Sequence, residues 1–510
     1  MRADLILAGG RIHTLGPCGL RPNSHLALAG GRVIASGGSD VMALRGPRTR
    51  LIRLRGAAVL PGFNDAHAHV VYHGLTLFGA DLGGSKTVAE IAARLRAHSR
   101  NLREREWQQG MGFRSTELLE RRPPHRLELD AATGSRPAFI DERGGHLRVA
   151  NTAALAVAGI TSSTPDPSGG RIGRDPDGFP NGILLESAMR MVADLQPPPS
   201  RERRRMAIEM TQRLLVSRGI TSVGAAVNRG FADDLLTFQE LAEARRLRVR
   251  VNEFLSWELL EAAAAIGIRA GYGGRMVRAG PIKVFVDGGA ERVVMREQQA
   301  SGIWRTPPDE LRALVKRATD VGLQVAAHAI GDGAIEAMCD AVQAAGGRGR
   351  RHRVEHCTIC PEDLRRRLGR LGMIAVMQPL AARAAKEAPG LFPARQREDL
   401  APHRGLMHAG VRVAFSSDMP VTPDPNPWRG IRAAVEDPVN GIEMLGALNA
   451  YTSVGAYASF EESVKGTLEP GMLADLQVYT EDPVEMSPER WDRLRPQAVL
   501  LGGARVFGVL

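Results

Sequence analysis

Two histidines two residues apart are the first side chains in this sequence that could do chemistry together. His67 and His69 follow an apolar run that begins at Val59 and is broken by Pro61 and Gly62, which is typical of a strand ending in polar residues. Because side chains alternate along a strand, both imidazoles lie on one side of it and can share a metal ion. Such a pair also occurs as ordinary buried or solvated histidines, so the metal interpretation depends on other residues.

Three more polar side chains end short β-rich runs later in the chain: His328, His356 and Asp418. A metal held by histidines with open coordination positions lowers the pKa of its bound water to about 7, and a nearby carboxylate can then move the proton. The set predicts metal-assisted hydrolysis, with His328 and Asp418 acting as catalytic residues and as metal ligands. For Asp418 the alternative is a cap at the start of a helix.

Lys283 lies inside the apolar run 282–287 and faces the same side as Asp287. Burying an ammonium group near several histidines costs free energy unless its positive charge is removed or balanced. Reaction with carbon dioxide would give an N6-carboxylated lysine, an anion that can bridge two cations. An ion pair with Asp287 or a neighbouring acid is the alternative.

Eight short strands would have to position these residues. They are expected at 59–69, 221–227, 249–255, 282–287, 324–328, 353–356, 373–378 and 411–418. Helix-length segments separate most of them, for example 310–320, 333–345 and 361–371. This alternation predicts an α/β protein with a (β/α)8 TIM barrel, whose strands present their carboxyl ends at one rim, where active sites are built.

Two further regions complete the expected domain organisation. Short strands with Gly-Gly turns occupy residues 1–58 and 463–510, and we expect both termini to form one small β-sandwich domain around the barrel of residues 59–462. About 150 residues separate the first two barrel strands, far more than a crossover requires. We therefore expect an insertion at 75–215 that caps the mouth of the barrel, although it could also be a peripheral domain.

The amino-acid composition and charge argue against several classes of function. The formal charge is +11 and the pI about 10.1, but the arginines are scattered among acids and aromatic residues make up only 5%, so nucleic-acid binding is not expected. Four cysteines do not form a disulfide framework, no secretory signal is evident, and no apolar run reaches the ~20 residues of a membrane helix. These features predict a cytoplasmic protein with a small-molecule substrate, without membrane or nucleic-acid partners, for which a homodimer is one allowed assembly.

The chain resembles the amidohydrolase superfamily of metal-dependent hydrolases, in the branch that contains N-substituted formamide deformylases (amidohydrolase family 3). The motifs that carry the resemblance are Pro61 to His69, Lys283 to Gly288, His328 to Asp332, Arg353 to His356, Ser416 to Val421, Gly145 to Ile160 and Gly466 to Asp475. The resemblance covers nearly the whole chain.

The resemblance implies particular roles for these residues. His67 and His69 would bind the more buried of one or two divalent ions, zinc being the expected metal, and His328 and His356 the more exposed one. Lys283 would be the carboxylated bridge, and Asp418 a ligand and the general acid/base. His146, in the insertion, would be a catalytic or substrate contact at the carbonyl oxygen, or else an exposed loop histidine.

The chain departs from the family pattern near strand four and in the insertion. After Asp287, a charged pair, Glu291 and Arg292, replaces the small polar residues expected there, and Phe113 stands where tryptophan is expected. We expect these four residues to contact the substrate, and the departures leave the substrate open.

The sequence thus predicts a hydrolase that acts on a carbon–nitrogen bond other than a peptide bond, most specifically in a linear amide or an N-substituted formamide. Cyclic-amide, deaminase or ester hydrolysis on the same site is one alternative. A non-catalytic binding protein with this fold is another.

Overall fold

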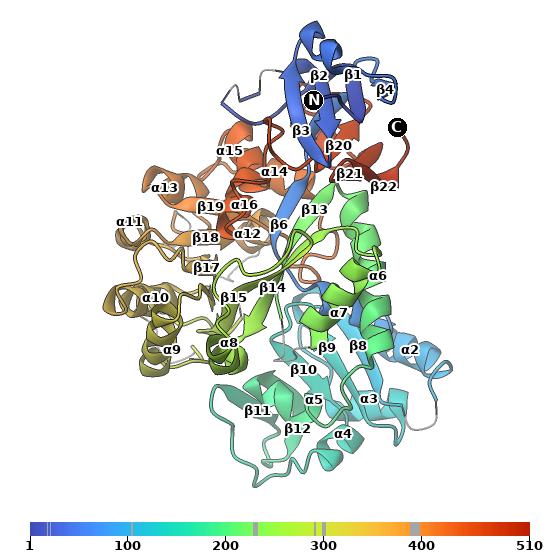
Figure 1. The fold of residues 1–510 in the computed structure, drawn as a ribbon. Helices are drawn as coiled ribbons and strands as arrows, with labels where there is room; N and C mark the ends of the chain where they lie inside the picture. Colours follow the sequence, from blue (N-terminus) through green and yellow to red (C-terminus); the bar gives the residue numbers. More distant parts are fainter. Residues whose placement is uncertain are drawn as a thin grey trace.

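A parallel eight-stranded sheet forms the centre of the protein in a computed structural model, which describes residues 1–17, 19–20, 22–103, 106–227, 233–289, 292–297, 302–387 and 398–510. Each strand pairs in parallel with its neighbours in the order β6-β13-β14-β15-β16-β17-β18-β19. The strands are β6 (Phe63–Ala68), β13 (Ile220–Ala225), β14 (Arg250–Ser256), β15 (Val277–Phe285), β16 (Val325–Ala329), β17 (Arg353–His356), β18 (Ile374–Met377) and β19 (Arg412–Phe415). The predicted (β/α)8 barrel is confirmed (Figure 1).

The barrel closes between its first and last strands through backbone hydrogen bonds just beyond their ends. The N–H of Asp418 donates to the carbonyl of His67 at 2.9 Å, and the N–H of His69 donates to the carbonyl of Met419 at 2.8 Å. Two segments separated by about 350 residues are thereby fixed side by side. The residues that close the barrel include three of the predicted metal ligands.

Helices cover the outside of the barrel (Figure 1). They are α1 (Val70–Thr76), α6 (Arg201–Ser217), α7 (Asp233–Glu243), α8 (Leu260–Ala265), which follows the short 3-10 turn η4 (Trp257–Leu259), α9 (Pro308–Asp320), α10 (Asp332–Ala344), α11 (Glu362–Leu371), α12 (Pro379–Glu387), α13 (His403–His408), α14 (Pro427–Val435), α15 (Met444–Ala450) and α16 (Ser453–Ala458). None of the helices in the described ranges is both long and apolar enough to cross a bilayer.

The apolar run expected as one strand from residue 59 is divided in two. Its first part, β5 (Ala58–Pro61), pairs with strands from both ends of the chain, and only β6 joins the barrel. Gly62 stands between them, where a Cβ would lie 2.1 Å from the hydroxyl of Thr221, so a larger residue would not fit. The chain changes sheets at this glycine.

Both termini contribute to a second sheet at the top of Figure 1, in the order β22-β21-β20-β5-β1-β2-β3 with β4 beside β1. Its strands are β1 (Leu5–Ile12), β2 (Asn23–Ala29), β3 (Arg32–Gly37), β4 (Arg50–Arg53), β20 (Leu476–Tyr479), β21 (Ala498–Leu501) and β22 (Ala504–Gly508), with the short helices η1 (Ser39–Leu44) and α17 (Pro488–Trp491). The fold class with an additional terminal sheet is confirmed, while the boundaries at 58 and 463 stay a prediction.

The long connection between β6 and β13 builds a third sheet, at the bottom of Figure 1, in the order β11-β12-β10-β9-β8-β7. Its strands are β7 (Ala80–Asp81), β8 (Gln108–Phe113), β9 (Ala138–Glu142), β10 (Leu147–Ala150), β11 (Gly170–Arg174) and β12 (Pro180–Glu186). Its helices are α2 (Val88–Ser99), η2 (Ser115–Glu117), α3 (Arg126–Thr133), α4 (Thr152–Val157), η3 (Ser187–Met189) and α5 (Arg190–Ala193). The insertion has hydrophobic clusters of its own, and these clusters stabilise its fold.

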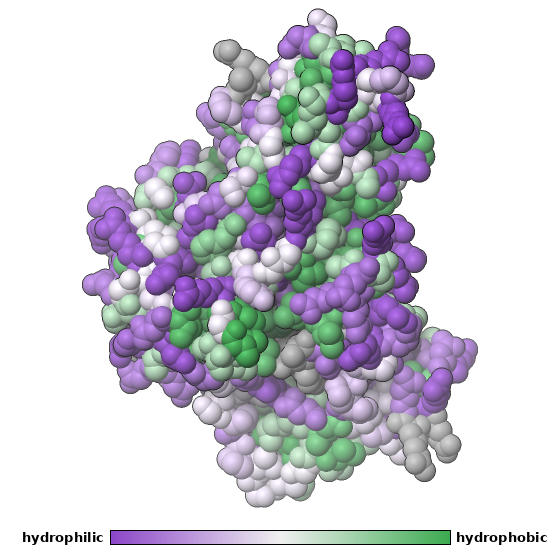
Figure 2. Space-filling view, viewed as in Figure 1, coloured by the Kyte–Doolittle hydropathy of each residue, from purple (hydrophilic) through white to green (hydrophobic). Residues whose placement is uncertain are grey.

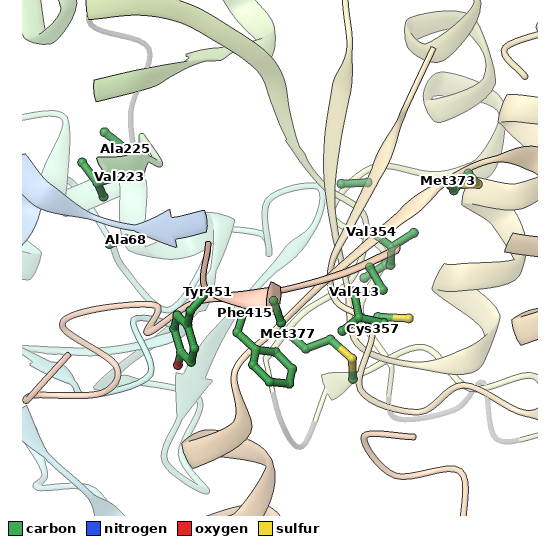
Figure 3. Packing of buried hydrophobic residues seen from close by; sticks show 14 of the residues in the cluster. Ala68, Val223, Ala225, Val354, Cys357, Met373, Met377, Val413, Phe415 and Tyr451 are labelled. Atoms are coloured by element: carbon green, nitrogen blue, oxygen red, sulfur yellow. The ribbon is translucent and has the colours of Figure 1, made fainter. Parts of the chain in front are cut away.

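Aliphatic and aromatic side chains fill the space between the barrel strands and the outer helices. Figure 3 shows Met377, Phe415 and Tyr451 together, and the rings of Phe415 and Tyr451 lie 5.5 Å apart in an edge-to-face arrangement. The face of the molecule in Figure 2 is mostly hydrophilic, with apolar side chains in separate patches. The packed layer holds the strand ends, and therefore the candidate site, in fixed positions.

Three buried histidines away from the predicted metal ligands are expected to make the fold acid-sensitive. Burial lowers the pKa of His73, His352 and His403 to about 4 from the ordinary 6.5. Nδ1 of His352 accepts a hydrogen bond from the N–H of Val325 at 3.0 Å, and a proton on that nitrogen would break the bond. Between about pH 6.5 and 4 the unfolded chain binds protons that the folded chain does not, so stability is lost as the pH falls through this window.

We therefore expect the thermal unfolding midpoint to fall steeply between pH 6.5 and 4, with each histidine contributing up to about 3 kcal/mol. His352→Asn keeps an acceptor near Val325 but removes one titrating group, so its midpoint should depend less on pH. Equal slopes for the variant and the parent protein would contradict this account.

Candidate metal centre

One ring nitrogen of His67 is hydrogen-bonded, and the other has no hydrogen-bond partner among the described residues. Its Nδ1 lies 2.5 Å from Oε2 of Glu355, and Nε2 is buried without a hydrogen-bond partner among the described residues. Burial, together with the nearby positive charge of Lys283, lowers the pKa of His67 to about 3, so the ring is neutral at neutral pH. A neutral histidine that donates from Nδ1 presents a lone pair at Nε2, which is what a metal ion requires.

Glu355 is itself fixed by Arg353, two residues earlier on β17. The guanidinium donates to both carboxylate oxygens, at 2.7 and 2.9 Å, and also to the carbonyl of Ala66 at 2.9 Å. Burial alone would raise the pKa of Glu355, but the charge of Arg353 and the hydrogen bond from His67 outweigh it and hold that pKa near 2. The carboxylate stays ionised and orients His67.

His69 and Asp418 face one another in a way that needs a positive charge between them. Nδ1 of His69 lies 2.9 Å from the carbonyl of Ala226, so this nitrogen carries the hydrogen and Nε2 carries a lone pair. That lone pair is 3.2 Å from Oδ1 of Asp418, which makes no hydrogen bond to a described residue. Two lone pairs at this distance repel unless a cation or a proton lies between them.

The side chains of His67, His69 and Asp418 therefore fit a metal ion. Their ligand atoms lie within 4.8 Å of one another, all three residues are buried, and within the described ranges no other set of three His, Cys, Asp or Glu residues meets this criterion. Burial would raise the pKa of Asp418, but the interaction with His69 and the neighbouring His356 and His67 outweighs it and holds that pKa well below its usual range. An ionised carboxylate and two bare imidazole nitrogens form a donor set that suits zinc.

His356 is oriented by a chain of hydrogen bonds that starts at Ser416. The hydroxyl of Ser416 accepts from Nε2 of Gln378 at 2.9 Å, so the amide oxygen of Gln378 faces His356 and accepts from its Nδ1 at 2.8 Å. This leaves Nε2 of His356 with a lone pair. The ring of His356 lies 5.5 Å from that of His67 and 4.5 Å from that of His328.

His328 lies at the end of β16 with Nε2 directed at backbone and carboxylate oxygens. That nitrogen is 3.5 Å from the carbonyl of Gly288 and 3.7 Å from Oδ1 of Asp287. Burial and the neighbouring histidines lower the pKa of His328 well below the ordinary value, so its ring is neutral. The structure thus brings all four predicted histidine ligands into one cluster, with His328 and His356 outside the tight three-residue group.

Lys283 extends into the same cluster without an ion pair or hydrogen bond to any described residue. Its Nζ is fully buried and lies 4.6 Å from the centre of the Phe285 ring. Burial lowers the pKa of Lys283 to about 8, against the opposing charges of Glu355 and Asp418. The alternative ion pair with Asp287 is not present.

His146 reaches this cluster from the insertion, and its ring lies 5.2 Å from that of His328. Its Nδ1 is 2.9 Å from Oε2 of Glu186, whose other oxygen accepts from the N–H of Gly289 at 3.0 Å. A Cβ at Gly289 would lie 2.4 Å from the His146 ring, so only glycine leaves room for it. Glu186 also lies 3.6 Å from the guanidinium of Arg305.

Glu186 is a residue whose role was not predicted, and its backbone is strained. Its φ is 53° and its ψ −121°, a conformation that residues other than glycine seldom adopt. Asp418 and His356 also have positive φ, at 54° and 73°. Such strain concentrates at functional sites, where the surrounding structure holds it in place.

Replacing Glu186 with Gln is expected to lower kcat/KM about tenfold, because the carboxylate that orients His146 is lost while the shape is kept. The metal content should not change. Glu117→Gln, at a more exposed position of the insertion, is the matched control. Identical pH profiles for Glu186→Gln and the parent would contradict a role through His146.

A cavity of about 530 Å³ opens onto these residues. It is lined by His69, Lys283, His328, His356 and Asp418 from the barrel, and by His146, Glu186, Met111, Phe139 and Arg143 from the insertion. The insertion therefore forms part of the cavity wall. The predicted capping role agrees with this geometry, although its limits at 75 and 215 stay a prediction.

The structure corrects two of the predicted substrate contacts. Phe113 is fully buried and does not line the cavity, because its side chain packs in the hydrophobic cluster of the insertion. Asp287 is fully buried and accepts from the N–H groups of Val294, Ile330 and Gly331 at 2.9–3.1 Å, so its oxygens are occupied in shaping the loop beside His328.

The charged pair after strand four was predicted to contact the substrate. Arg292 is half-buried and does not line the cavity. Glu291 lies outside the described residues.

Known proteins with similar sequences and folds agree with this picture. The profile of the Amidohydrolase family matches residues 50–507. The chain is 28% identical to N-substituted formamide deformylase from Arthrobacter pascens, over 90% of both chains, and 28% identical to protein LONG AFTER FAR-RED 3 from Arabidopsis thaliana, over 99% of this chain and 92% of that one. The crystal structure of an uncharacterized metal-dependent hydrolase from Pyrococcus horikoshii OT3 has a TM-score of 0.77 at 25% identity, over 95% of this chain and 99% of that one.

Proposed function

This chain belongs to the amidohydrolase family and is a metal-dependent hydrolase of carbon–nitrogen bonds, and from this premise we propose that its substrate is a linear amide, most specifically an N-substituted formamide. The observation that carries the proposal is the buried group of His67, His69 and Asp418. His69 and Asp418 of this group line a cavity large enough for a small amide. The similarity to a formamide deformylase supports the choice of substrate.

The proposed cofactor is Zn²⁺. His67, His69 and Asp418 would hold one ion, and His328 and His356 would hold a second, with Lys283 as a bridge. When bound, the ion supplies Lewis acidity that activates water and polarises the carbonyl oxygen.

The protein's own side chains then have separate tasks. Asp418 takes the proton of the attacking water on a carboxylate oxygen and delivers it to the leaving nitrogen. The carboxylate of Glu186 accepts from Nδ1 of His146 and orients the ring. In its protonated form, His146 can donate from Nε2–H to the carbonyl oxygen of the substrate as negative charge develops there. The buried walls of the cavity keep other water molecules away from these groups.

Lys283 is proposed to be carboxylated. Its Nζ attacks carbon dioxide, a nitrogen–carbon bond forms, one amine proton passes to solvent, and the product is a carbamate anion. The lowered pKa favours this reaction because only the neutral amine is nucleophilic. We expect a carbamate signal in the ¹³C NMR spectrum of protein supplied with ¹³C-bicarbonate and zinc, and no such signal in Lys283→Arg. The same signal in both proteins would contradict the assignment.

Hydrolysis of N-alkylformamides tests the proposed function. We expect formate release to stop after treatment with a chelator and to return when zinc is added. Chelator-resistant hydrolysis would contradict metal dependence, and zinc-dependent turnover of other amides without any turnover of formamides would contradict the proposed substrate.

A further inference from the structure

One acidic side chain in the cavity wall has no partner among the described residues and no role in the proposed mechanism. Glu253, on β14, is only 2% exposed, yet it lines the same cavity as Asp418 and Lys283. Its carboxyl group makes no hydrogen bond or ion pair with any described residue, and its Oε2 is fully enclosed. Buried polar groups in native proteins are almost always paired, so such a group calls for a functional explanation.

Glu253 does not face the metal centre directly. The next residue, Phe254, packs against His67 with ring centres 5.6 Å apart, so Phe254 points into the barrel and Glu253 to the other side of the sheet. The cavity lining also includes residues of α6 and α7. These two helices pack against each other beside β14 (Figure 1). This part of the cavity is called the distal arm below and is lined by Glu253, Asp234, Arg204, Val227, Leu75 and Trp257.

Among the described residues that line the distal arm, Arg204 is the buried cation, and it already pairs with Asp234 and lies 3.5 Å from Asp233. Within the described part of the chain, Glu253 therefore faces Asp234 without a cation of its own. Burial raises the pKa of Glu253 well above its ordinary value, and the neighbouring charge of Asp234 raises it further. A bound cation would favour the ionised form of this carboxyl group.

The register of the strands gives the separation between the backbones at the distal arm and at the metal centre. Ala68, between His67 and His69, pairs with Ala225 on β13, and Ala225 pairs with Glu253 on β14. Two strand spacings place the backbone of Glu253 about 10 Å from that of Ala68. An extended N-substituent that ends in a charged nitrogen can reach over a separation of this order, and Val227, Leu75 and Trp257 offer it apolar surface.

We propose that the distal arm is a subsite for a positively charged nitrogen, an ammonium or amidinium group at the end of the substrate's N-substituent, bound by the carboxylate of Glu253. This inference rests on the proposed function for the identity of the scissile bond. The cation supplies the counter-charge that Glu253 lacks, while the apolar wall holds the linker. Neutral N-alkyl groups of the same length leave the carboxyl group unpaired.

A pair of matched formamides tests the subsite by turnover. N-formyl-1,5-diaminopentane ends in an ammonium group and N-formylhexylamine ends in a methyl group at the same position. We expect kcat/KM of the zinc-loaded enzyme to be 10- to 100-fold higher for the cationic compound. Glu253→Gln should abolish this preference, whereas Glu261→Gln, an exposed position on α8, should keep it.

Binding measured by calorimetry separates this proposal from the proposed reaction. The zinc-loaded protein should bind hexylamine, which ends in an ammonium group, at least tenfold more tightly than the uncharged 1-hexanol, and Glu253→Gln should bind both equally. If the preference for the amine is present but neither formamide is hydrolysed, the subsite stands and the formamide substrate is wrong. Equal affinity for the amine and the alcohol in the parent protein, or a preference that survives Glu253→Gln, overturns the subsite, and the comparison in the parent protein holds even if the variant does not fold.

Discussion

Asp418→Asn is expected to lower kcat by about 10²- to 10⁴-fold, because the amide cannot accept the proton of the attacking water. The fold should be preserved, since Asp418 has a φ of 54° and asparagine tolerates this left-handed conformation well. The backbone N–H that closes the barrel onto His67 is also unchanged. One carboxamide oxygen remains available, so the protein should still bind zinc, more weakly than the parent.

Steady-state kinetics and metal analysis of the same preparation would check this prediction. Asp424→Asn is the matched control, because Asp424 follows the same strand but pairs with Arg218 away from the cavity. A variant that keeps zinc and more than a tenth of the parent's kcat would show that Asp418 is a ligand but not the proton acceptor.

Glu355→Leu is expected to destabilise the protein by about 3–5 kcal/mol, because it leaves the buried guanidinium of Arg353 without its counter-charge. Arg353 is 1% exposed and donates to both oxygens of Glu355, so no water can replace the carboxylate. The same change removes the group that orients His67, and zinc affinity should fall by about 10- to 100-fold.

Urea unfolding of the metal-free protein measures the first effect, and competition with a zinc chelator measures the second. The double variant Arg353→Leu/Glu355→Leu should recover much of the stability but not the zinc affinity. Recovery of both would mean that Glu355 acts only as a partner of Arg353, and recovery of neither would mean that the leucines pack poorly.

The barrel and its ligands could be predicted because the pattern is local. Each of His67, His328, His356 and Asp418 ends or follows an apolar strand, and parallel strands bring such ends to one rim. The sequence also contained a sign of the Arg353–Glu355 pair, since two opposite charges two residues apart in a buried strand share one face. In the sequence, the two residues form part of the motif from Arg353 to His356.

The partners that orient the ligands could not be predicted, because they come from distant parts of the chain. Glu355 bonds to a histidine 288 residues away, and Glu186 bonds to His146 across 40 residues of the insertion. Phe113 was misassigned because an aromatic residue at a strand end fits either a cavity wall or a core, and only the packing of the insertion decides. The division of the first strand at Gly62 likewise depends on Thr221, a residue of another strand.

Anomalous scattering from crystals of the zinc-loaded protein would test the central claim most directly. We expect a zinc peak about 2.0–2.1 Å from Nε2 of both His67 and His69, with an oxygen of Asp418 in the same coordination shell. No peak at this position, with Nε2 of His69 hydrogen-bonded directly to Asp418, would contradict the metal centre and the hydrolytic mechanism built on it.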